Sequence, residues 1–121
     1  MNPQNYKAGQ FDERPWGHWL VMDVMPRSVV KKLTVDPGKR ISLQRHRYRS
    51  ERWMVVDGTA AVQCDGQLYH IGPGEQIFLP KGCLHRLGND TEKPVTVIEI
   101  QFGEVLSEDD IERFTDDYGR V

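Results

Sequence analysis

Four side chains of types that bind metal ions occur at spacings that would bring them together in a strand-rich fold. Gln44 and His46 lie two positions apart, Glu51 follows shortly after, and His85 comes later in the chain. Alternate residues of an extended strand share one face, so Gln44 and His46 would point the same way. An amide oxygen, two imidazoles and a carboxylate make a mixed donor set that suits Zn, Mn, Co, Ni or Fe. The sequence therefore predicts a site for one divalent metal ion, without distinguishing among these metals, with room for water or substrate.

The stretch between Gly38 and Gly58 is also strongly basic, although the whole chain carries a net charge of -2. Its cations are Lys39, Arg40, Arg45, Arg47, Arg49 and Arg52. A guanidinium group binds phosphate through two parallel hydrogen bonds, so arginine is a favoured partner of a small anionic substrate. We expect Arg49, between His46 and Glu51, to belong to the site. Ordinary surface charges are expected at Lys31, Lys32, Lys39, Arg40 and Arg45. The charge balance gives no reason to expect nucleic-acid binding.

Short apolar runs separated by turn residues dominate the chain between residues 29 and 102. Asp-Gly pairs at residues 57–58 and 65–66 and a Gly-Pro-Gly triplet at 72–74 punctuate these runs. Such residues suit the tight turns of β-hairpins. Many short strands at this spacing predict an all-β sandwich or closed barrel. We expect residues 14–121 to form a single domain, preceded by a polar N-terminal arm over residues 1–13.

The pattern predicts one helix, near the C-terminus. Ser107 is a good helix cap, and Asp110 stands at the capping-box position three residues later. Ile111, Phe114 and Tyr118 would lie roughly on one face of this helix. We therefore expect a short C-terminal α-helix after the strands.

We expect neither a secretion signal nor a membrane span in this chain. The first residues have no apolar core, and no apolar run approaches the roughly 20 residues that a span needs. Two cysteines are too few for a disulfide scaffold. We therefore expect a soluble cytoplasmic protein that does not bind a membrane.

The candidate ligands fall within two segments that resemble the two sequence motifs of the cupin superfamily. The first motif is matched by Gly38, Gln44, His46, Glu51 and Gly58, with Gln44 in place of the first histidine. The second motif is matched by Gly74, Pro80, Gly82, His85 and Asn89. This resemblance implies an all-β fold, a small double-stranded β-helix with a jelly-roll-like barrel. It also implies that the four candidate ligands converge on one metal ion inside that barrel.

Further segments resemble one group of cupins, the type II mannose-6-phosphate isomerase domain. They are RPWG from residue 14, the run from Ser42 to Trp53, VVDGTA from residue 55, IEIQFG from residue 98 and the acidic run from Glu108 to Arg120. That domain is usually the C-terminal part of a bifunctional enzyme whose N-terminal part is a mannose-1-phosphate guanylyltransferase. The resemblance covers residues 11–121. It implies a metal-dependent isomerase that interconverts mannose 6-phosphate and fructose 6-phosphate.

The same resemblance implies roles for individual residues. The family's functional arginines correspond by position to Arg14, Arg49, Arg113 and Arg120. We expect Arg14, Arg49 and Arg120 to hold the anionic end of the sugar, while Arg113 shares a face with Arg120 on the expected helix. Glu51 or metal-bound solvent would move the proton. Cupins commonly pair through strand edges, so a homodimer is also expected.

Two positions depart from the family's pattern, because Tyr48 and Arg52 stand where the family usually has histidine. Both changes remove a group that titrates near neutral pH, and arginine cannot serve as a general base. They favour a second hypothesis, a non-catalytic cupin that binds a sugar phosphate or nucleotide sugar and accompanies a separate guanylyltransferase. A third is another metal-dependent cupin reaction, such as epimerisation or oxygenation of a small acid. The segments at residues 14–17 and 116–120 argue against the third, because a generic cupin does not need them.

Overall fold

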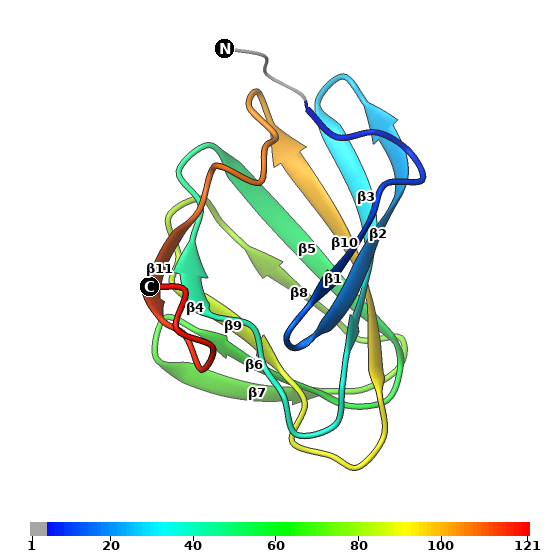
Figure 1. Ribbon diagram of the computed structural model, residues 1–121, viewed down its shortest axis with the longest axis vertical. Helices are drawn as coiled ribbons and strands as arrows, with labels where there is room; N and C mark the ends of the chain where they lie inside the picture. The colour runs from blue at the N-terminus through cyan, green and yellow to red at the C-terminus, as the bar shows by residue number, and fades with distance from the viewer. Residues whose placement is uncertain (1–4) are drawn as a thin grey trace.

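The computed structural model describes residues 5–121, which fold into two antiparallel β-sheets (Figure 1). One sheet has six strands in the order β1-β2-β3-β10-β5-β8, and the other has five in the order β11-β4-β9-β6-β7. The strands are β1 (Phe11–Arg14), β2 (Gly17–Met25), β3 (Ser28–Val35), β4 (Leu43–Arg45), β5 (Arg49–Asp57), β6 (Ala60–Cys64), β7 (Gln67–Ile71), β8 (Gln76–Leu79), β9 (His85–Gly88), β10 (Val95–Gly103) and β11 (Glu112–Thr115). The predicted all-β class is confirmed.

The hydrophobic core is built by alternation along the strands. In β3, Val29, Lys31, Leu33 and Val35 are buried, whereas the residues between them are partly exposed. Strand β5 shows the same period of two, with Trp53 facing inward. Because strands bury alternate side chains, polar residues at inward positions are brought together inside the molecule.

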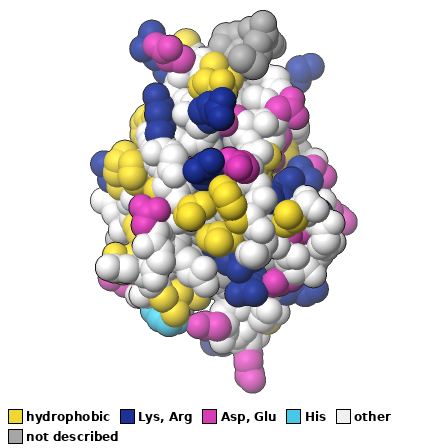
Figure 2. Space-filling view, turned by 90° about the vertical axis from the view of Figure 1, so that its left-hand side faces the viewer, with side chains coloured by type: hydrophobic (Ala, Val, Ile, Leu, Met, Phe, Trp, Pro, Cys, Tyr) yellow, Lys and Arg dark blue, Asp and Glu magenta, His cyan; other side chains and the backbone are white. Residues whose placement is uncertain are grey.

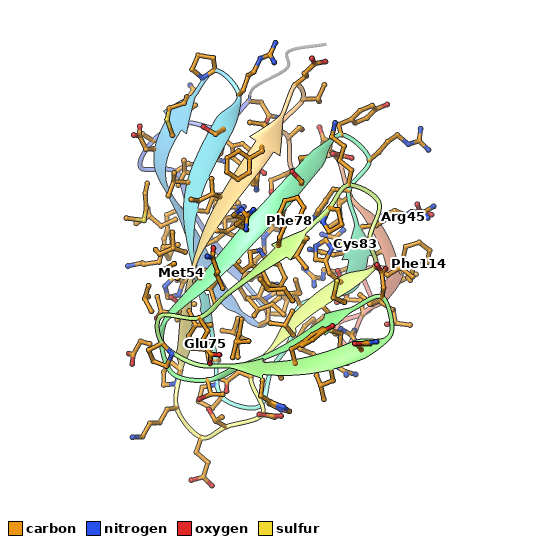
Figure 3. The ribbon with its side chains drawn as sticks, turned by 180° about the vertical axis from the view of Figure 1, so that it is seen from behind. Arg45, Met54, Glu75, Phe78, Cys83 and Phe114 are labelled. Atoms are coloured by element: carbon orange, nitrogen blue, oxygen red, sulfur yellow. The ribbon has the colours of Figure 1, made fainter. Side chains whose placement is uncertain are left out.

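The outer face of the six-stranded sheet is partly apolar. Met54 on β5 and Phe78 on β8 lie on this face and are 40% and 45% exposed (Figure 3). Arg52 is the cross-strand neighbour of Phe78, and its guanidinium lies 4.7 Å from the centroid of that ring. Arg52 therefore points out of the molecule, away from the buried Glu51 and Trp53 on the same strand.

The predicted C-terminal helix is wrong. The described residues contain no helix, and hence none long and apolar enough to cross a membrane. Ser107 caps a single turn, because its hydroxyl accepts the amide of Asp109 at 3.1 Å and its carbonyl accepts that of Asp110 at 3.2 Å. The Asp110 carboxylate then bonds the amides of Arg47 and Tyr48 instead of a helix terminus. The chain continues as β11, which pairs with β4 and gives that strand its second neighbour.

The predicted N-terminal arm lies partly outside the described residues, because residues 1–4 are not described. In its remainder, Tyr6 is only 5% exposed and the amide of Asn5 donates to the carbonyl of Leu106 at 3.4 Å. The arm then enters β1, which pairs with β2. The domain boundary at residue 14 stays a prediction.

The predicted Asp-Gly turn between β6 and β7 is confirmed by its backbone. Asp65 and Gly66 form a two-residue loop with φ angles of 47° and 85°. Successive positive φ angles are typical of a type I′ turn, whose twist matches that of the paired strands. On its other edge β6 pairs with β9, which places Cys64 opposite His85.

Gly103 controls how closely β10 approaches the start of β5. A Cβ atom at this position would lie 2.4 Å from the carbonyl oxygen of Tyr48 and 3.2 Å from the Cα of Arg49. We expect Gly103→Ala to lower the free energy of unfolding by about 1–3 kcal/mol, because backbone would have to move. Urea unfolding followed by tryptophan fluorescence would measure the change.

Gly72→Ala is the matched control. The nearest atom to a Cβ at Gly72 is Oε1 of Glu75 at 3.6 Å, an ordinary contact distance. We expect a change within about 0.5 kcal/mol at this surface position. Equal stability of the two variants would contradict the close approach at Gly103.

Candidate metal centre

Three of the predicted metal ligands meet inside the molecule. Glu51 comes from the six-stranded sheet, on β5, whereas His46 follows β4 and His85 begins β9 in the five-stranded sheet. Each is at most 2% exposed, and their candidate ligand atoms all lie within 4.8 Å of one another. This buried triad could hold a metal ion.

His46 is held as a neutral imidazole. Its Nδ1 lies 2.7 Å from the carbonyl oxygen of Asp110, which can only accept, so the proton belongs on Nδ1. Burial, followed by the charge of Arg49 and the neighbouring His85, lowers the pKa of His46 to about 3. The unprotonated Nε2 then lies 3.3 Å from Oε2 of Glu51. A carbonyl partner on the far nitrogen orients a histidine for metal ligation.

His85 offers the second imidazole. Its Nδ1 lies 3.2 Å from the carbonyl oxygen of Cys83, whereas its Nε2 is buried and has no hydrogen-bond partner within the described chain. A buried nitrogen of this kind is costly unless another group satisfies it. Nε2 lies 3.8 Å from Oε1 of Glu51, beside the other two ligands. Two imidazoles and a carboxylate therefore fit a divalent ion such as Zn, Mn, Fe, Co or Ni.

Gln44, the fourth predicted ligand, lies beside the triad. It is the register partner of His85 across β4 and β9, so the two side chains share a face. Its Oε1 accepts a hydrogen bond of 3.0 Å from the hydroxyl of Ser42. Its role as a metal ligand stays a prediction.

Glu51 is fixed by donors two positions away on its own strand. Nε of Arg49 donates to Oε2 at 2.8 Å, and Nε1 of Trp53 donates to Oε1 at 3.2 Å. Arg49 also donates from Nη1 to the carbonyl of Ser107 at 2.8 Å, and its Nη2 lies 3.4 Å from Nε2 of His46. Burial alone would lower the pKa of Arg49, but Glu51 and other anions raise it, so the guanidinium stays charged. Arg49 therefore neutralises the buried carboxylate.

A second buried carboxyl group, that of Glu99, lies next to the triad. Trp53 donates to its Oε2 at 3.1 Å, and Nε2 of Gln101 donates to its Oε1 at 2.6 Å. Burial, and then the charge of Glu51, raises the pKa of Glu99. Glu99 is therefore suited to hold a proton beside the cavity.

A small, partly open cavity of about 60 Å³ adjoins His46 of the triad. Its lining includes all four predicted arginines, Arg14, Arg49, Arg113 and Arg120. They come from β1, β5, β11 and the residues after β11, so only the fold brings them together.

The arginines differ in how much of their donor capacity is already used. Arg120 makes two hydrogen bonds to the carboxylate of Asp116, at 2.9 and 2.8 Å, and Arg14 lies 3.0 Å from Asp12. Arg113 has a buried Nε with no hydrogen-bond partner among residues 5–121. Burial and the nearby Arg120 also lower the pKa of Arg113. Arg113 is thus a cavity cation with an unmet need for an acceptor.

Three polar residues beside the cavity were not expected there. Lys31, predicted at the surface, is 3% exposed, with Nζ 3.2 Å from Oε2 of Glu108 and 4.0 Å from the centroid of the Trp19 ring. The hydroxyl of Tyr6 donates to the same carboxylate. The inward place of Lys31 in the alternation of β3 was a signal that could have located it. No comparable pattern marks Tyr6 or Glu108.

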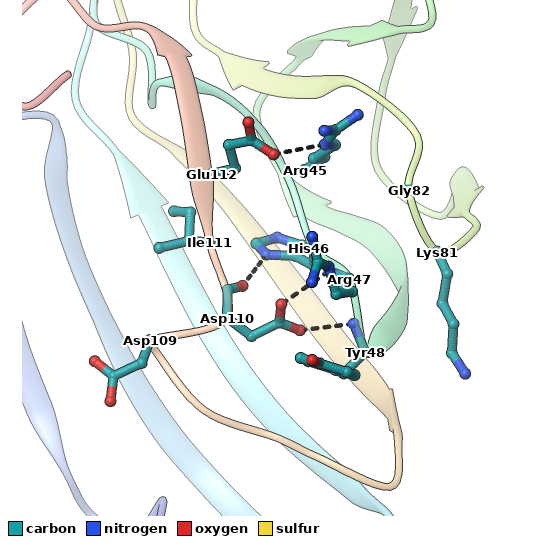
Figure 4. Close-up of a pocket in the computed structure, with 10 residues that line it drawn as sticks. All are labelled: Arg45, His46, Arg47, Tyr48, Lys81, Gly82, Asp109, Asp110, Ile111 and Glu112. Atoms are coloured by element: carbon teal, nitrogen blue, oxygen red, sulfur yellow. Dashed lines mark hydrogen bonds and ion pairs between the residues drawn. The ribbon is translucent and has the colours of Figure 1, made fainter.

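The two positions that depart from the family's pattern do not face the triad. Arg52 lies on the outer face of the six-stranded sheet, next to Phe78. Tyr48 is 42% exposed and lines an open outer pocket of about 480 Å³ (Figure 4). On the face that carries β4 and β11, basic, acidic and hydrophobic side chains are interspersed (Figure 2). Arg52 is therefore kept away from the triad, whereas Tyr48 shares the outer pocket with His46.

Comparison with known proteins defines the family. The family model described as "Mannose-6-phosphate isomerase C-terminal" matches residues 2–116. The chain is 46% identical over 108 residues to the alginate biosynthesis protein AlgA of Pseudomonas aeruginosa. It is 45% identical over 108 residues to the mannose-1-phosphate guanylyltransferase of Escherichia coli strain K12. Each match covers 89% of this chain but only 22% and 23% of those proteins, so the chain spans less than a quarter of their length.

Solved structures show the fold. The Cnp3 cupin domain of Schizosaccharomyces pombe superimposes with a TM-score of 0.68 at 9% sequence identity, over 71% of this chain and 64% of that one. Fold and site together define a cupin domain with a buried His-Glu-His triad that could hold a metal ion. The chain belongs to the family of mannose-6-phosphate isomerase C-terminal domains, which confirms the predicted resemblance.

Glu108→Gln should destabilise the fold in a pH-dependent way. Burial alone would raise the pKa of Glu108, but Lys31, the Tyr6 hydroxyl and Arg49 outweigh it and hold the pKa at about 2, below the ordinary 4.5. The contribution is therefore fully present above about pH 4.5 and is lost as the pH falls toward 2. Because the side chain is 36% exposed, we expect a loss of about 1–3 kcal/mol at pH 7. Urea titrations across this pH range would measure it.

Glu104→Gln serves as the control for this series. The side chain of Glu104 is 81% exposed and lies 3.9 Å from the equally exposed Arg27. We expect its stability to stay within about 0.5 kcal/mol of the unsubstituted chain. A deficit of Glu108→Gln that persisted undiminished at the acid end would argue against the ionised pair.

Proposed function

We propose that this protein is a metal-dependent sugar-phosphate isomerase that interconverts mannose 6-phosphate and fructose 6-phosphate. The observation that carries the proposal is the buried triad beside a cavity lined by arginines. Within residues 5–121, Nε2 of His85 in this triad has no hydrogen-bond partner. Membership of the mannose-6-phosphate isomerase C-terminal family supports the choice of substrate. The activities of the longer relatives are not carried over to this chain, because it matches less than a quarter of their length.

The triad and Gln44 are the residues that would hold the ion. Nε2 of His46 and Nε2 of His85 are the imidazole donors, because the Nδ1 atom of each ring lies against a backbone carbonyl oxygen. Glu51 adds the carboxylate, and Gln44 a fourth donor. A bound divalent ion would polarise the sugar carbonyl and stabilise the negative charge that develops on its oxygen.

The cavity arginines would hold the phosphate. Arg113 is the principal candidate, because its buried Nε has no acceptor in the described part of the chain and Arg120 lies nearby. Arg14 and Arg120 would complete the anion site once the phosphate competes with Asp12 and Asp116 for their guanidinium groups. Arg49 is committed to Glu51 and to the carbonyl of Ser107, so its role is to hold the carboxylate.

Isomerisation also requires a group that takes a proton from one carbon and returns it to the next. Glu51 and Glu99 are the buried carboxyl groups of this region. If Glu51 holds the ion, the proton transfer falls to Glu99, whose raised pKa suits a group that is protonated and deprotonated in turn. The cavity is smaller than the few hundred Å³ of ordinary ligand sites, and it is partly open to solvent.

The alternative is a non-catalytic cupin that binds a sugar phosphate or nucleotide sugar. One observation favours it: Arg49 already contacts Oε2 of Glu51 and lies near Nε2 of His46, two of the atoms that an ion would need. The outward position of Arg52 removes an argument that the sequence offered for it. A homodimer, a cytoplasmic location and the absence of nucleic-acid or membrane binding stay predictions.

The decisive experiment is turnover of mannose 6-phosphate by the pure protein. Metal-stripped protein should be inactive, and adding Mn, Zn, Co, Ni or Fe(II) singly should restore formation of fructose 6-phosphate with at least one of them. His85→Ala should be inactive with every metal. His70→Ala, which removes an exposed histidine paired with Asp90 at 2.8 Å, should stay active. If the protein were inactive with all five metals but still bound sugar phosphate, the non-catalytic alternative would be favoured.

Arg113→Gln should raise the KM for mannose 6-phosphate by about tenfold or more, because a hydrogen bond between charged groups contributes about 1.5–3 kcal/mol. Steady-state kinetics of the metal-loaded protein would give KM and kcat separately. Arg45→Gln is the matched control, because Arg45 is exposed and bound to Glu112 at 2.8 Å. An unchanged KM in Arg113→Gln would remove that residue from the phosphate site.

A further inference from the structure

The connection between β10 and β11 makes three hydrogen bonds to the short segment that carries His46. All three involve Asp110 (Figure 4). Its carbonyl oxygen lies 2.7 Å from Nδ1 of His46, and its two carboxylate oxygens accept the amides of Arg47 at 2.8 Å and Tyr48 at 2.9 Å. One residue thus bonds three successive positions of a segment far from it in the chain.

Apart from Asp110, the amide of Gly82 donates to the carbonyl oxygen of His46 at 3.0 Å. Strand β4 ends at Arg45 and β5 begins at Arg49, so residues 46–48 lie outside both ladders. Their backbone amides need acceptors, and the Asp110 carboxylate supplies two of them with the strength of charge-assisted bonds. The imidazole of His46 would otherwise have no fixed acceptor for its Nδ1 proton.

Asp110 is itself held by the turn at residues 107–110. Its amide donates to the carbonyl of Ser107 at 3.2 Å, and the amide of Asp109 donates to the Ser107 hydroxyl at 3.1 Å. The same Ser107 carbonyl accepts Nη1 of Arg49, the residue that fixes Glu51. The turn therefore acts on two members of the triad. Asp110 bonds His46 directly, and Ser107 bonds Arg49, which in turn holds Glu51.

We propose that Asp110 is a positioning residue that sets the tautomer and orientation of His46, and through them the affinity of the triad for a divalent ion. Asp110 would not touch the ion. Its carboxylate pins residues 46–48, and this keeps its own carbonyl against Nδ1, so that Nε2 presents its lone pair to the centre. The part of the inference that concerns metal affinity rests on the metal centre proposed above.

The first test needs no metal. Nitrogen-15 NMR of the histidine rings distinguishes the two neutral tautomers, and His46→Gln would assign the signals. In the unsubstituted chain we expect His46 to show one tautomer, with the proton on Nδ1. In Asp110→Ala we expect the two nitrogen shifts to move toward each other as the tautomers mix. Unchanged nitrogen-15 chemical shifts of His46 in a folded Asp110→Ala variant would overturn the proposal. Asp110 would then only cap the backbone amides of this loop.

The second test measures Co(II) affinity by titration of its visible absorption bands. We expect Asp110→Ala to bind Co(II) about 10–100-fold more weakly, as is typical when a histidine ligand loses its outer partner. Asp109→Ala is the matched control, because it removes the same charge one residue earlier, at an exposed side chain. Equal affinities of the two variants would count against Asp110.

Asp110→Asn allows the same two measurements if Asp110→Ala does not fold. The amide retains one acceptor oxygen, so one of the two segment amides stays bonded and an intermediate affinity and tautomer mixture are expected. Shifts and affinity identical to the unsubstituted chain would overturn the proposal. If the unsubstituted chain bound no Co(II), the metal centre would fail, whereas the NMR comparison would still decide the role of Asp110.

Discussion

The burial of the Glu51 carboxylate is the constraint on which the rest of the site depends. An ionised carboxylate removed from water costs several kcal/mol unless charge and hydrogen bonds replace its hydration. Arg49 supplies the charge and Trp53 a second donor. Arg49 is itself buried, so it needs the carbonyl of Ser107, which requires the β10–β11 connection to fold over the site. Each buried polar group thus specifies the position of the next one.

The same strands build the hydrophobic core and the site. Along β10 the inward residues change from apolar Val95 and Val97 to polar Glu99 and Gln101, all of them buried. The apolar part contributes burial free energy, whereas the polar part must be satisfied by neighbouring strands before it ceases to cost stability. Trp53 joins the two regions, since its ring is buried while its indole nitrogen donates to both carboxyl groups. A cupin can therefore place charges at its centre without losing a continuous core.

Facing direction decides which side chains can take part in chemistry. Arg52 stands next to Glu51 in the chain, yet it stacks on Phe78 on the opposite face of the sheet. Lys31 and Lys32 show the same separation, because Lys31 is buried beside Glu108 and Lys32 is partly exposed. A substitution read from the chain alone therefore says little about catalysis until its face is known. Here Arg52 lies away from the triad, whereas Tyr48 lines an outer pocket together with His46.

Several features of the fold and the site followed from local rules. Alternating apolar residues and the Asp-Gly pair at residues 65–66 predicted strands and a hairpin turn, because side-chain period and positive φ depend only on neighbouring residues. The spacing of His46, Glu51 and His85, through its resemblance to cupin motifs, located the triad.

Other features depended on partners that are distant in the chain. Ser107 begins a turn that could have continued as a helix, but β4 offered backbone partners, and the segment became β11. The ion pair of the buried Lys31 with Glu108 depends on the β10–β11 connection lying against β3. The buried Nε of Arg113, which has no hydrogen-bond partner among residues 5–121, likewise depends on packing between distant segments. The sequence by itself determined the strands between residues 29 and 102, the turn at residues 65–66 and the identity of the triad. The tertiary structure alone decided which charges are buried and which are paired, because burial and long-range hydrogen bonds arise only when distant strands meet.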